Sequence, residues 1–207
     1  MKAFKGLILL RPIVANLFIC LLIVGCKTPF ATRGPENPQQ RRSLWIPPTA
    51  PEFVMDNLKN AMKECNATNY LRCLATDSTT IKTFRFEADH AAMQRNPGVF
   101  ENWNFQKESN YIHLLFSKVP RDSLVTLILY RPAQGQDYVS EDSVVYVREY
   151  DLTVHHTIAS DLCPREVKGR GEFHLARQHD GNWVIYFWRD IGIENYPSWS
   201  DLKAYSW

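Results

Sequence analysis

The sequence predicts one α+β domain in which helices come first and an antiparallel sheet follows. Apolar residues recur at helical spacing over 51–65, which indicates an amphipathic helix. After residue 123, four segments rich in branched and aromatic residues are separated by turn-forming stretches, as is typical of strands. Asp180-Gly181, between the last two segments, is a strong hairpin signal. The early helices are therefore expected to pack against a sheet formed by the second half of the chain.

The first helix is expected to begin in the sequence TAPE, residues 49–52. Thr49 can cap the exposed amides, Glu52 can reach back to complete a capping box, and Pro51 is tolerated in the first turn. A second, short helix is predicted over 70–74. One face of the first helix carries its apolar residues, which are Val54, Leu58, Ala61, Met62 and Cys65.

A short strand is predicted within 81–87, ahead of four longer ones. A two-residue turn at Asp180-Gly181 would pair Phe173 with Trp188 and Leu175 with Tyr186. The longer strands are expected over 124–130, 144–157, 166–178 and 183–189.

The last predicted strand is apolar on both faces, so its outer face needs a cover. Trp183, Ile185 and Phe187 would lie on that outer face in a regular strand. Either the terminal segment, with Trp199 and its neighbours, folds back over this face, or a second copy of the chain covers it.

The N-terminus has the order of a secretory signal, with basic residues ahead of an apolar run. The run over 12–25 is too short to span a bilayer. It ends in LLIVGCK, residues 21–27, where branched and small residues directly precede Cys26. This stretch resembles the lipobox of bacterial lipoproteins, in which the signal, here 1–25, is removed and the cysteine is acylated. The alternative is an ordinary secretory signal or an uncleaved anchor, with Cys26 incidental.

The lipobox resemblance implies a protein held in the bacterial cell envelope by acyl chains such as palmitate on Cys26. Lys27 is not the aspartate that marks inner-membrane retention in enterobacteria, which favours the outer membrane. Residues 26–48 contain five prolines and few aliphatic residues, so a flexible linker is expected there. The folded domain is expected over 49–207.

The charge and cysteine content exclude several classes of partner. The chain has 24 basic and 22 acidic side chains, and three of the basic ones lie in the signal, so the mature chain is close to neutral. A nucleic-acid partner is therefore not expected. No paired CxxC motif is present, so neither a metal nor another cofactor is expected. Disulfide pairing among Cys65, Cys73 and Cys163 stays open.

The order of segments resembles the nuclear transport factor 2-like superfamily over residues 50–205. The segments are PEFVMDNLKNAM, NYLRCL, FRFEAD, a tryptophan near Glu108, GNWVIYFWRD and SWSDLKAY. The resemblance implies N-terminal helices packed in a strongly curved antiparallel sheet that forms a cone. In that superfamily the interior of the cone can be a ligand pocket.

The candidate pocket-lining residues are aromatic rings and one imidazole expected to face the interior. They are Phe84, Phe86, Trp103, His113, Tyr146, Tyr150, Phe173, Tyr186 and Trp188. No catalytic residue is assigned, because Asp89-His90 and Asp190 match no motif of the superfamily's enzymes.

Two functions are consistent with these features. The favoured one is a membrane-tethered lipoprotein that binds a small apolar ligand or a partner protein, with a homodimer as a further option. The alternative is a hydrolase, isomerase or dehydratase with its site in the cone, as in the ketosteroid isomerases and scytalone dehydratase-like members. A ring-lined cavity with converging ionisable groups would favour the enzyme. An interior filled by its own side chains would favour binding.

Cys26 is expected to become the lipidated N-terminus of the mature protein. The intact mass of the mature chain should then include the acyl chains, and the protein should partition into detergent. Cys26→Ser is expected to abolish cleavage and acylation together. The same membrane fraction and the same cleaved mass from Cys26→Ser would contradict this prediction.

Overall fold

The computed structural model of the chain describes residues 43–76, 82–133 and 136–206. The predicted signal peptide and the predicted lipidation site Cys26 lie outside the described residues. Within the described part of the chain, no helix has the length and apolar character needed to cross a bilayer. The helices are α2 (Pro51–Glu64), α3 (Ala67–Arg72), α4 (His90–Arg95), α5 (Phe105–Ser117) and α6 (Trp199–Ala204), and the strands are β1 (Arg85–Glu87), β2 (Val125–Tyr130), β3 (Tyr138–Val139), β4 (Ser143–Val154), β5 (Glu166–Arg177) and β6 (Trp183–Gly192).

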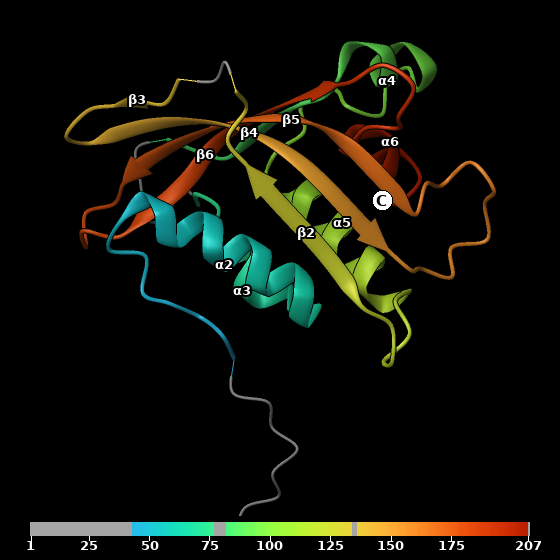
Figure 1. Cartoon of the computed structure of the whole chain (residues 1–207), viewed down its shortest axis with the longest axis horizontal. Coiled ribbons are helices and arrows are strands. Elements are labelled where there is room, and N and C mark those ends of the chain that lie inside the picture. Colours follow the sequence, from blue (N-terminus) through green and yellow to red (C-terminus); the bar gives the residue numbers. More distant parts are fainter. Residues whose placement is uncertain (1–42, 77–81, 134–135, 207) are drawn as a thin grey trace, which may run out of the picture. The chain divides into compact units, whose positions relative to one another are not determined.

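The strands form one six-stranded sheet in the order β1-β6-β5-β4-β2, and β3 also pairs with β4. All pairs are antiparallel except β1, which runs parallel to β6. Figure 1 shows the long strands β4, β5 and β6 passing over α2, α3 and α5, which lie on one side of the sheet. The predicted α+β class is confirmed, and the four long strands lie close to their predicted ranges.

Helix α2 begins without the predicted capping box. Its N-cap is Ala50, and no side chain caps it, so the role predicted for Thr49 is wrong. Pro51 occupies the first turn, as expected. The Glu52 carboxylate instead accepts a hydrogen bond from the hydroxyl of Tyr146 on β4, at 2.5 Å. The tertiary contact with the sheet therefore takes the carboxylate that a local cap would have used.

An extended segment, residues 43–48, lies along α2. The buried side chain of Asn57 accepts a hydrogen bond from the Ile46 amide at 2.8 Å and donates one to its carbonyl at 2.6 Å. Glu64 accepts one from the Leu44 amide at 2.6 Å. These residues are the end of the linker expected over 26–48, of which 26–42 lie outside the described part of the chain.

The β5–β6 hairpin has a three-residue loop rather than the predicted two-residue turn. The Gln178 amide donates to the Asn182 carbonyl at 2.7 Å, and Gly181 has φ +85°. This loop shifts the register by one residue, and a bulge between His174 and Leu175 restores it. Phe173 therefore pairs with Trp188 as predicted. Leu175 pairs with Ile185, so its predicted pairing with Tyr186 is wrong.

The bulge also changes which side chains of β6 are buried. Ile185 and Trp188 are both fully buried, although three residues apart in a strand, because the bulged register turns Ile185 inward beside Leu175. Phe187 is half-buried and lies beside the His174 ring, with centroids 4.9 Å apart. The prediction that Trp183, Ile185 and Phe187 share an outer face is therefore wrong.

The terminal helix α6 packs against the domain, but on the inner side of the sheet. Trp199 and Leu202 are buried, and the Trp199 ring contacts Trp188 at 4.6 Å and Tyr150 at 5.4 Å between centroids. Both partners point into the interior. The expected cover over the outer face of β6 is therefore not provided by α6.

The three described cysteines are free thiols. Cys65 ends α2 in a left-handed conformation with φ 49°. Cys73 is buried, and its thiol donates to the Asn69 carbonyl at 3.3 Å. Burial raises the pKa of Cys163 to about 11, which keeps its thiol protonated and unreactive at neutral pH.

Gly169 is predicted to be required for the packing of β5 against β4. A Cβ at this position would lie 2.6 Å from Cζ of Tyr150 and 2.8 Å from the Ile191 carbonyl oxygen. Gly169→Ala should therefore lower the free energy of unfolding by about 1–3 kcal/mol in a urea titration. Arg170→Ala, at the exposed neighbouring position, is the control and should change it by less than about 0.5 kcal/mol. Equal stability of the two variants would contradict the prediction.

Candidate functional site

The interior of the domain contains a buried ion pair between Glu108 on α5 and Lys203 on α6. Both side chains have no exposed surface, and the ammonium contacts Oε1 of Glu108. Tyr70 donates a hydrogen bond to Oε1 at 2.5 Å, and the Trp103 indole donates one to Oε2 at 2.6 Å. The carboxylate is thus bound by three donors from three parts of the chain, as a buried charge requires.

Four aromatic rings surround the Lys203 ammonium. Its Nζ lies 4.3 Å from the ring centroid of Tyr111, 4.4 Å from Phe86, 4.8 Å from Trp188 and 5.4 Å from Trp103. Aromatic faces attract a desolvated cation, so the rings stabilise the ammonium on the sides that Glu108 does not reach. The charged end of Lys203 therefore lies inside the domain, between Glu108 and these four rings.

Burial shifts the pKa values of several groups in the interior. It lowers the pKa of Lys203, and the adjacent charge of Glu108 opposes this effect. Burial, followed by the charge of Glu108, raises the pKa of Tyr70 and of Tyr111 well above the ordinary value. Both phenols are therefore protonated at neutral pH.

A second polar cluster binds the start of α6 to β6. The Asp190 carboxylate accepts hydrogen bonds from the Tyr150 hydroxyl at 2.7 Å and from the amide and hydroxyl of Ser200 at 2.7 and 2.6 Å. The Trp199 amide donates to the Tyr150 oxygen at 2.7 Å, and its indole donates to Tyr111 at 2.8 Å. Burial raises the pKa of Asp190, and the hydrogen bonds that Asp190 accepts from Ser200 and Tyr150 oppose this shift.

Ionisable groups thus converge in the interior, but their polar atoms are occupied by one another. Glu108 and Lys203 are fully buried, and Asp190 is 2% exposed. A general base needs space beside it for a substrate atom at hydrogen-bonding distance. Here the positions at hydrogen-bonding distance of the interior carboxylates are taken by Lys203, Tyr70 and Trp103 at Glu108, and by Tyr150 and Ser200 at Asp190. Among the described residues, no group of three or more histidine, cysteine, aspartate or glutamate side chains could hold a metal ion.

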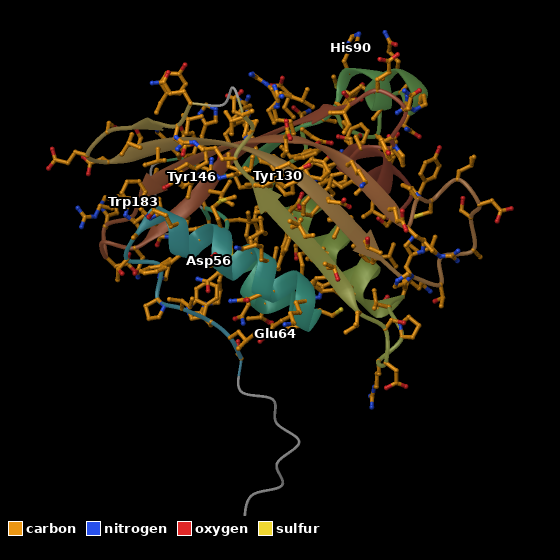
Figure 2. The ribbon with its side chains drawn as sticks, viewed as in Figure 1. Asp56, Glu64, His90, Tyr130, Tyr146 and Trp183 are labelled. Carbon is orange, nitrogen blue, oxygen red and sulfur yellow. The ribbon has the colours of Figure 1, made fainter. Side chains whose placement is uncertain are left out.

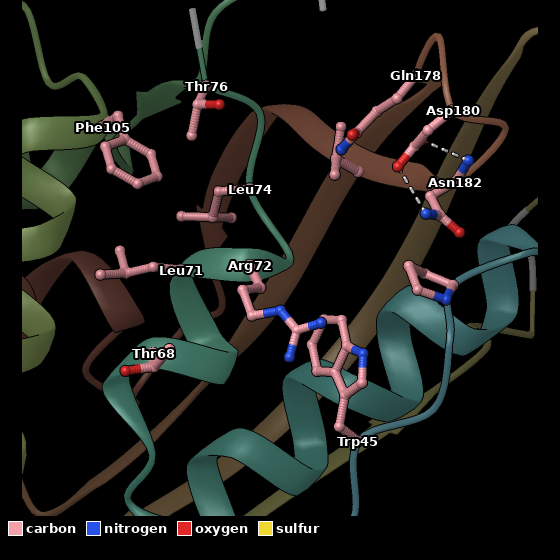
Figure 3. Close-up of a pocket in the computed structure, with 12 residues that line it drawn as sticks. Trp45, Thr68, Leu71, Arg72, Leu74, Thr76, Phe105, Gln178, Asp180 and Asn182 are labelled. Atoms are coloured by element: carbon pink, nitrogen blue, oxygen red, sulfur yellow. Dashed lines mark hydrogen bonds between the residues drawn. The ribbon is translucent and has the colours of Figure 1, made fainter. Parts of the chain in front are cut away.

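An open groove of about 460 Å³ lies outside this interior, between α3, the segment 43–48 and the β5–β6 hairpin (Figure 3). Its accessible apolar lining comes from Trp45, Leu71 and Phe105, which are half-buried, while Leu74 and Val184 also line it but are each 2% exposed. Its polar rim includes Arg72, Gln178, Asp180 and Asn182. Pockets of this size that are mainly apolar with a few polar groups are typical of small-molecule sites.

A second pocket, of about 480 Å³, lies beside β1. Phe84, Phe86 and Trp103 contribute to its lining, but each is at most 5% exposed. Its accessible lining comes mainly from polar side chains and backbone, including Arg85 and Asn102. This pocket therefore offers less apolar surface than the groove.

The structure brings only some of the predicted pocket residues together. The rings of Phe86, Trp103, Phe173 and Trp188 form a connected cluster with centroid distances of 5.0 to 5.9 Å. Tyr150 joins it through Trp199. These residues surround buried side chains, so their role as ligand lining stays a prediction.

The other predicted residues lie elsewhere. Phe84 is buried, and Tyr146 is buried beside Glu52, where α2 begins. Tyr186 is half-buried at the β6 bulge, and His113 is exposed on α5. None of these four side chains surrounds the Lys203 ammonium.

Asp89 and His90 follow β1, and Asp89 has a structural role. Asp89 caps α4, accepting from the Ala92 amide at 3.0 Å, and it also accepts from the Gly192 amide at 2.9 Å. His90 is exposed at the outer end of α4 (Figure 2). The pair is therefore not assembled into a site.

The sequence reasoning missed Glu108 and Lys203, although their spacing carried a signal. Glu108 lies three and four residues before Tyr111 and Ile112, on the apolar face of its helix. Lys203 lies four residues after Trp199, also on an apolar face. Opposite charges on the buried faces of two helices indicate a buried pair.

Comparison with known proteins shows the fold. No family model matches the sequence, and no curated protein is similar to it. A candidate aromatic ring hydroxylase from Novosphingobium aromaticivorans is 12% identical, with a TM-score of 0.51, covering 74% of this chain and 94% of its own. A conserved protein from Planctomyces limnophilus is 10% identical, with a TM-score of 0.51, covering 69% and 92%. A nuclear transport factor 2-like superfamily protein from Salmonella enterica is 14% identical, with a TM-score of 0.47, covering 67% and 85%.

The domain shares its α+β fold with the proteins from Novosphingobium aromaticivorans and Planctomyces limnophilus. Its helices lie against a strongly curved sheet that does not close on itself (Figure 1). Identities of 10–14% show the fold alone and carry no activity to this chain.

Lys203 is predicted to be essential for stability because it neutralises a fully buried carboxylate. Lys203→Met should lower the free energy of unfolding by about 3–5 kcal/mol in a urea titration. Adding Glu108→Gln to that variant should restore part of the loss, since no unpaired charge then remains buried.

Lys168 provides the matched control, because it forms an ion pair with Asp151 at 2.6 Å in which both side chains are 32% exposed. Lys168→Met should cost no more than about 1 kcal/mol. If Lys203→Met cost as little as Lys168→Met, the buried pair would not have the stabilising role assigned to it.

Proposed function

We propose that this nuclear transport factor 2-like domain, whose interior carboxylates are bound by its own side chains, binds a small apolar ligand in the groove beside α3. The protein is then a membrane-tethered binding protein without catalysis. The proposal concerns the groove of about 460 Å³ and not the interior of the sheet.

The observation that carries the proposal is the position of Lys203. Its ammonium occupies the centre of the ring cluster and is paired with Glu108, without exposed surface. An apolar ligand cannot enter there without leaving a charge unpaired, which costs several kcal/mol. The groove, by contrast, presents Leu71 and Phe105 as half-buried apolar surface, open to a ligand.

A hydrolase, isomerase or dehydratase is supported less well. The buried Asp190–Tyr150 pair and Glu108 resemble an acid–base set in composition. Such chemistry needs a substrate cavity beside those groups. Ser200 and the ammonium of Lys203 take the positions next to the carboxylates. Candidate hydroxylase and dehydratase names among proteins of similar fold do not replace that missing space.

Acylation of Cys26 would hold this domain at the outer membrane of a bacterial cell envelope. Residues 26–42 would then tether it, since the segment from 43 onward is bound to α2. The groove would remain accessible to ligands in the compartment outside the bilayer. This placement rests on the lipobox-like stretch before Cys26.

The groove is predicted to bind a neutral apolar probe, 2-naphthamide. In isothermal titration calorimetry with the full-length protein, Leu71→Gln should weaken binding about tenfold or more, because it places a polar group in the apolar lining. Leu114→Gln, at a 36% exposed leucine on α5, is the control and should bind as the unaltered protein does.

Circular dichroism should show that both variants are folded. The absence of binding to the unaltered protein, or equal binding by the two variants, would contradict the proposed function.

A further inference from the structure

We propose that the groove selects ligands that carry a carboxylate on an apolar body, and that Arg72 binds the carboxylate. This inference rests on the proposed function and specifies its ligand class. It follows from how the two charged residues of the groove, Arg72 and Asp180, are bonded.

Arg72 lies at the end of α3 with its guanidinium carbon over the Trp45 ring, 3.9 Å from the ring centroid (Figure 3). Stacking covers one face of the guanidinium and holds its plane, while the N–H groups project from the edges. One of them donates a long hydrogen bond, 3.4 Å, to the side chain of Asn69. Within the described residues, no carboxylate lies within ion-pair distance of Arg72.

Asp180, on the hairpin loop, is already bonded. Its two carboxylate oxygens accept hydrogen bonds from the amide and the side chain of Asn182, at 3.0 and 2.8 Å. These bonds lower the pKa of Asp180, so it stays ionised within its own turn. Asp180 keeps its charge, but both of its oxygens are hydrogen-bonded within its own turn, whereas Arg72 has no ion-pair partner among the described residues; Arg72 is therefore the charged group of the groove that is placed to bind an anionic ligand.

A planar guanidinium with its face covered and its edge exposed fits a carboxylate, because two parallel N–H groups can bind its two oxygens. The apolar side chains next to it belong to the same region of the fold. Leu71 precedes Arg72 in α3, and Leu74 follows it by two residues. Leu74 is buried, so a ligand whose carboxylate meets Arg72 would place its apolar part on Leu71 and Phe105, which are half-buried.

The backbone next to Trp45 is fixed by hydrogen bonds within the protein, without a ligand. Asn57 binds both the amide and the carbonyl of Ile46, the residue after Trp45. Asn57 is fully buried in α2, so the position of the indole is tied to the core. The stacked guanidinium is therefore preorganised, which lowers the entropic cost of binding an anion.

The test compares 2-naphthoate with its neutral analogue 2-naphthamide by titration calorimetry on the full-length protein. The carboxylate should bind the unaltered protein about tenfold tighter than the amide. Arg72→Gln should abolish that preference while leaving the affinity for 2-naphthamide nearly unchanged. Arg72→Lys should retain only part of it, because an ammonium binds as a point charge.

Arg170→Gln is the matched control, since Arg170 is an exposed arginine on β5 that forms an ion pair with Glu149. It should preserve the full preference for 2-naphthoate. Equal binding of the two ligands by the unaltered protein, or a preference that survives Arg72→Gln, would overturn the carboxylate site alone. If neither ligand binds, the proposed function fails as well.

Discussion

The burial of one ion pair, Glu108 with Lys203, is the constraint on which the rest of the domain depends. A charge without exposed surface must be matched by an opposite charge and hydrogen bonds, or the folded state loses several kcal/mol. Here the partners come from α3, α5, the loop before α5 and α6. The pair therefore joins α6, near the end of the described chain, to α5, α3 and the loop before α5 at one point inside the domain.

Filling the interior in this way changes what the fold can offer a ligand. The aromatic rings that could line a pocket instead surround the Lys203 ammonium. The network of Asp190, Tyr150 and Ser200 fixes α6 against β6, next to the same cluster. The open groove that we propose as the ligand site lies instead at the outside of the domain, where it is lined by Trp45 and α3.

The β5–β6 hairpin shows how local geometry decides burial. A three-residue loop moves the register by one position, and the bulge beside His174 moves it back. Both Ile185 and Trp188 thereby become buried, which a regular alternation does not allow. Trp188 can then contact Lys203, so the arrangement of the interior depends on this one irregularity.

The sequence by itself determined the α+β class, the long strands and the amphipathic face of α2, because these follow from local periodicity and turn residues. The Phe173–Trp188 pairing, predicted from a two-residue turn, is also confirmed, although the loop has three residues, because the bulge restores the register. Only the tertiary structure decided the rest. Three contacts show this, because each joins residues that are far apart in the sequence. They are the Glu52–Tyr146 hydrogen bond, the Glu108–Lys203 ion pair and the contact between Arg72 and Trp45. Their contacts depend on distances that no local pattern encodes.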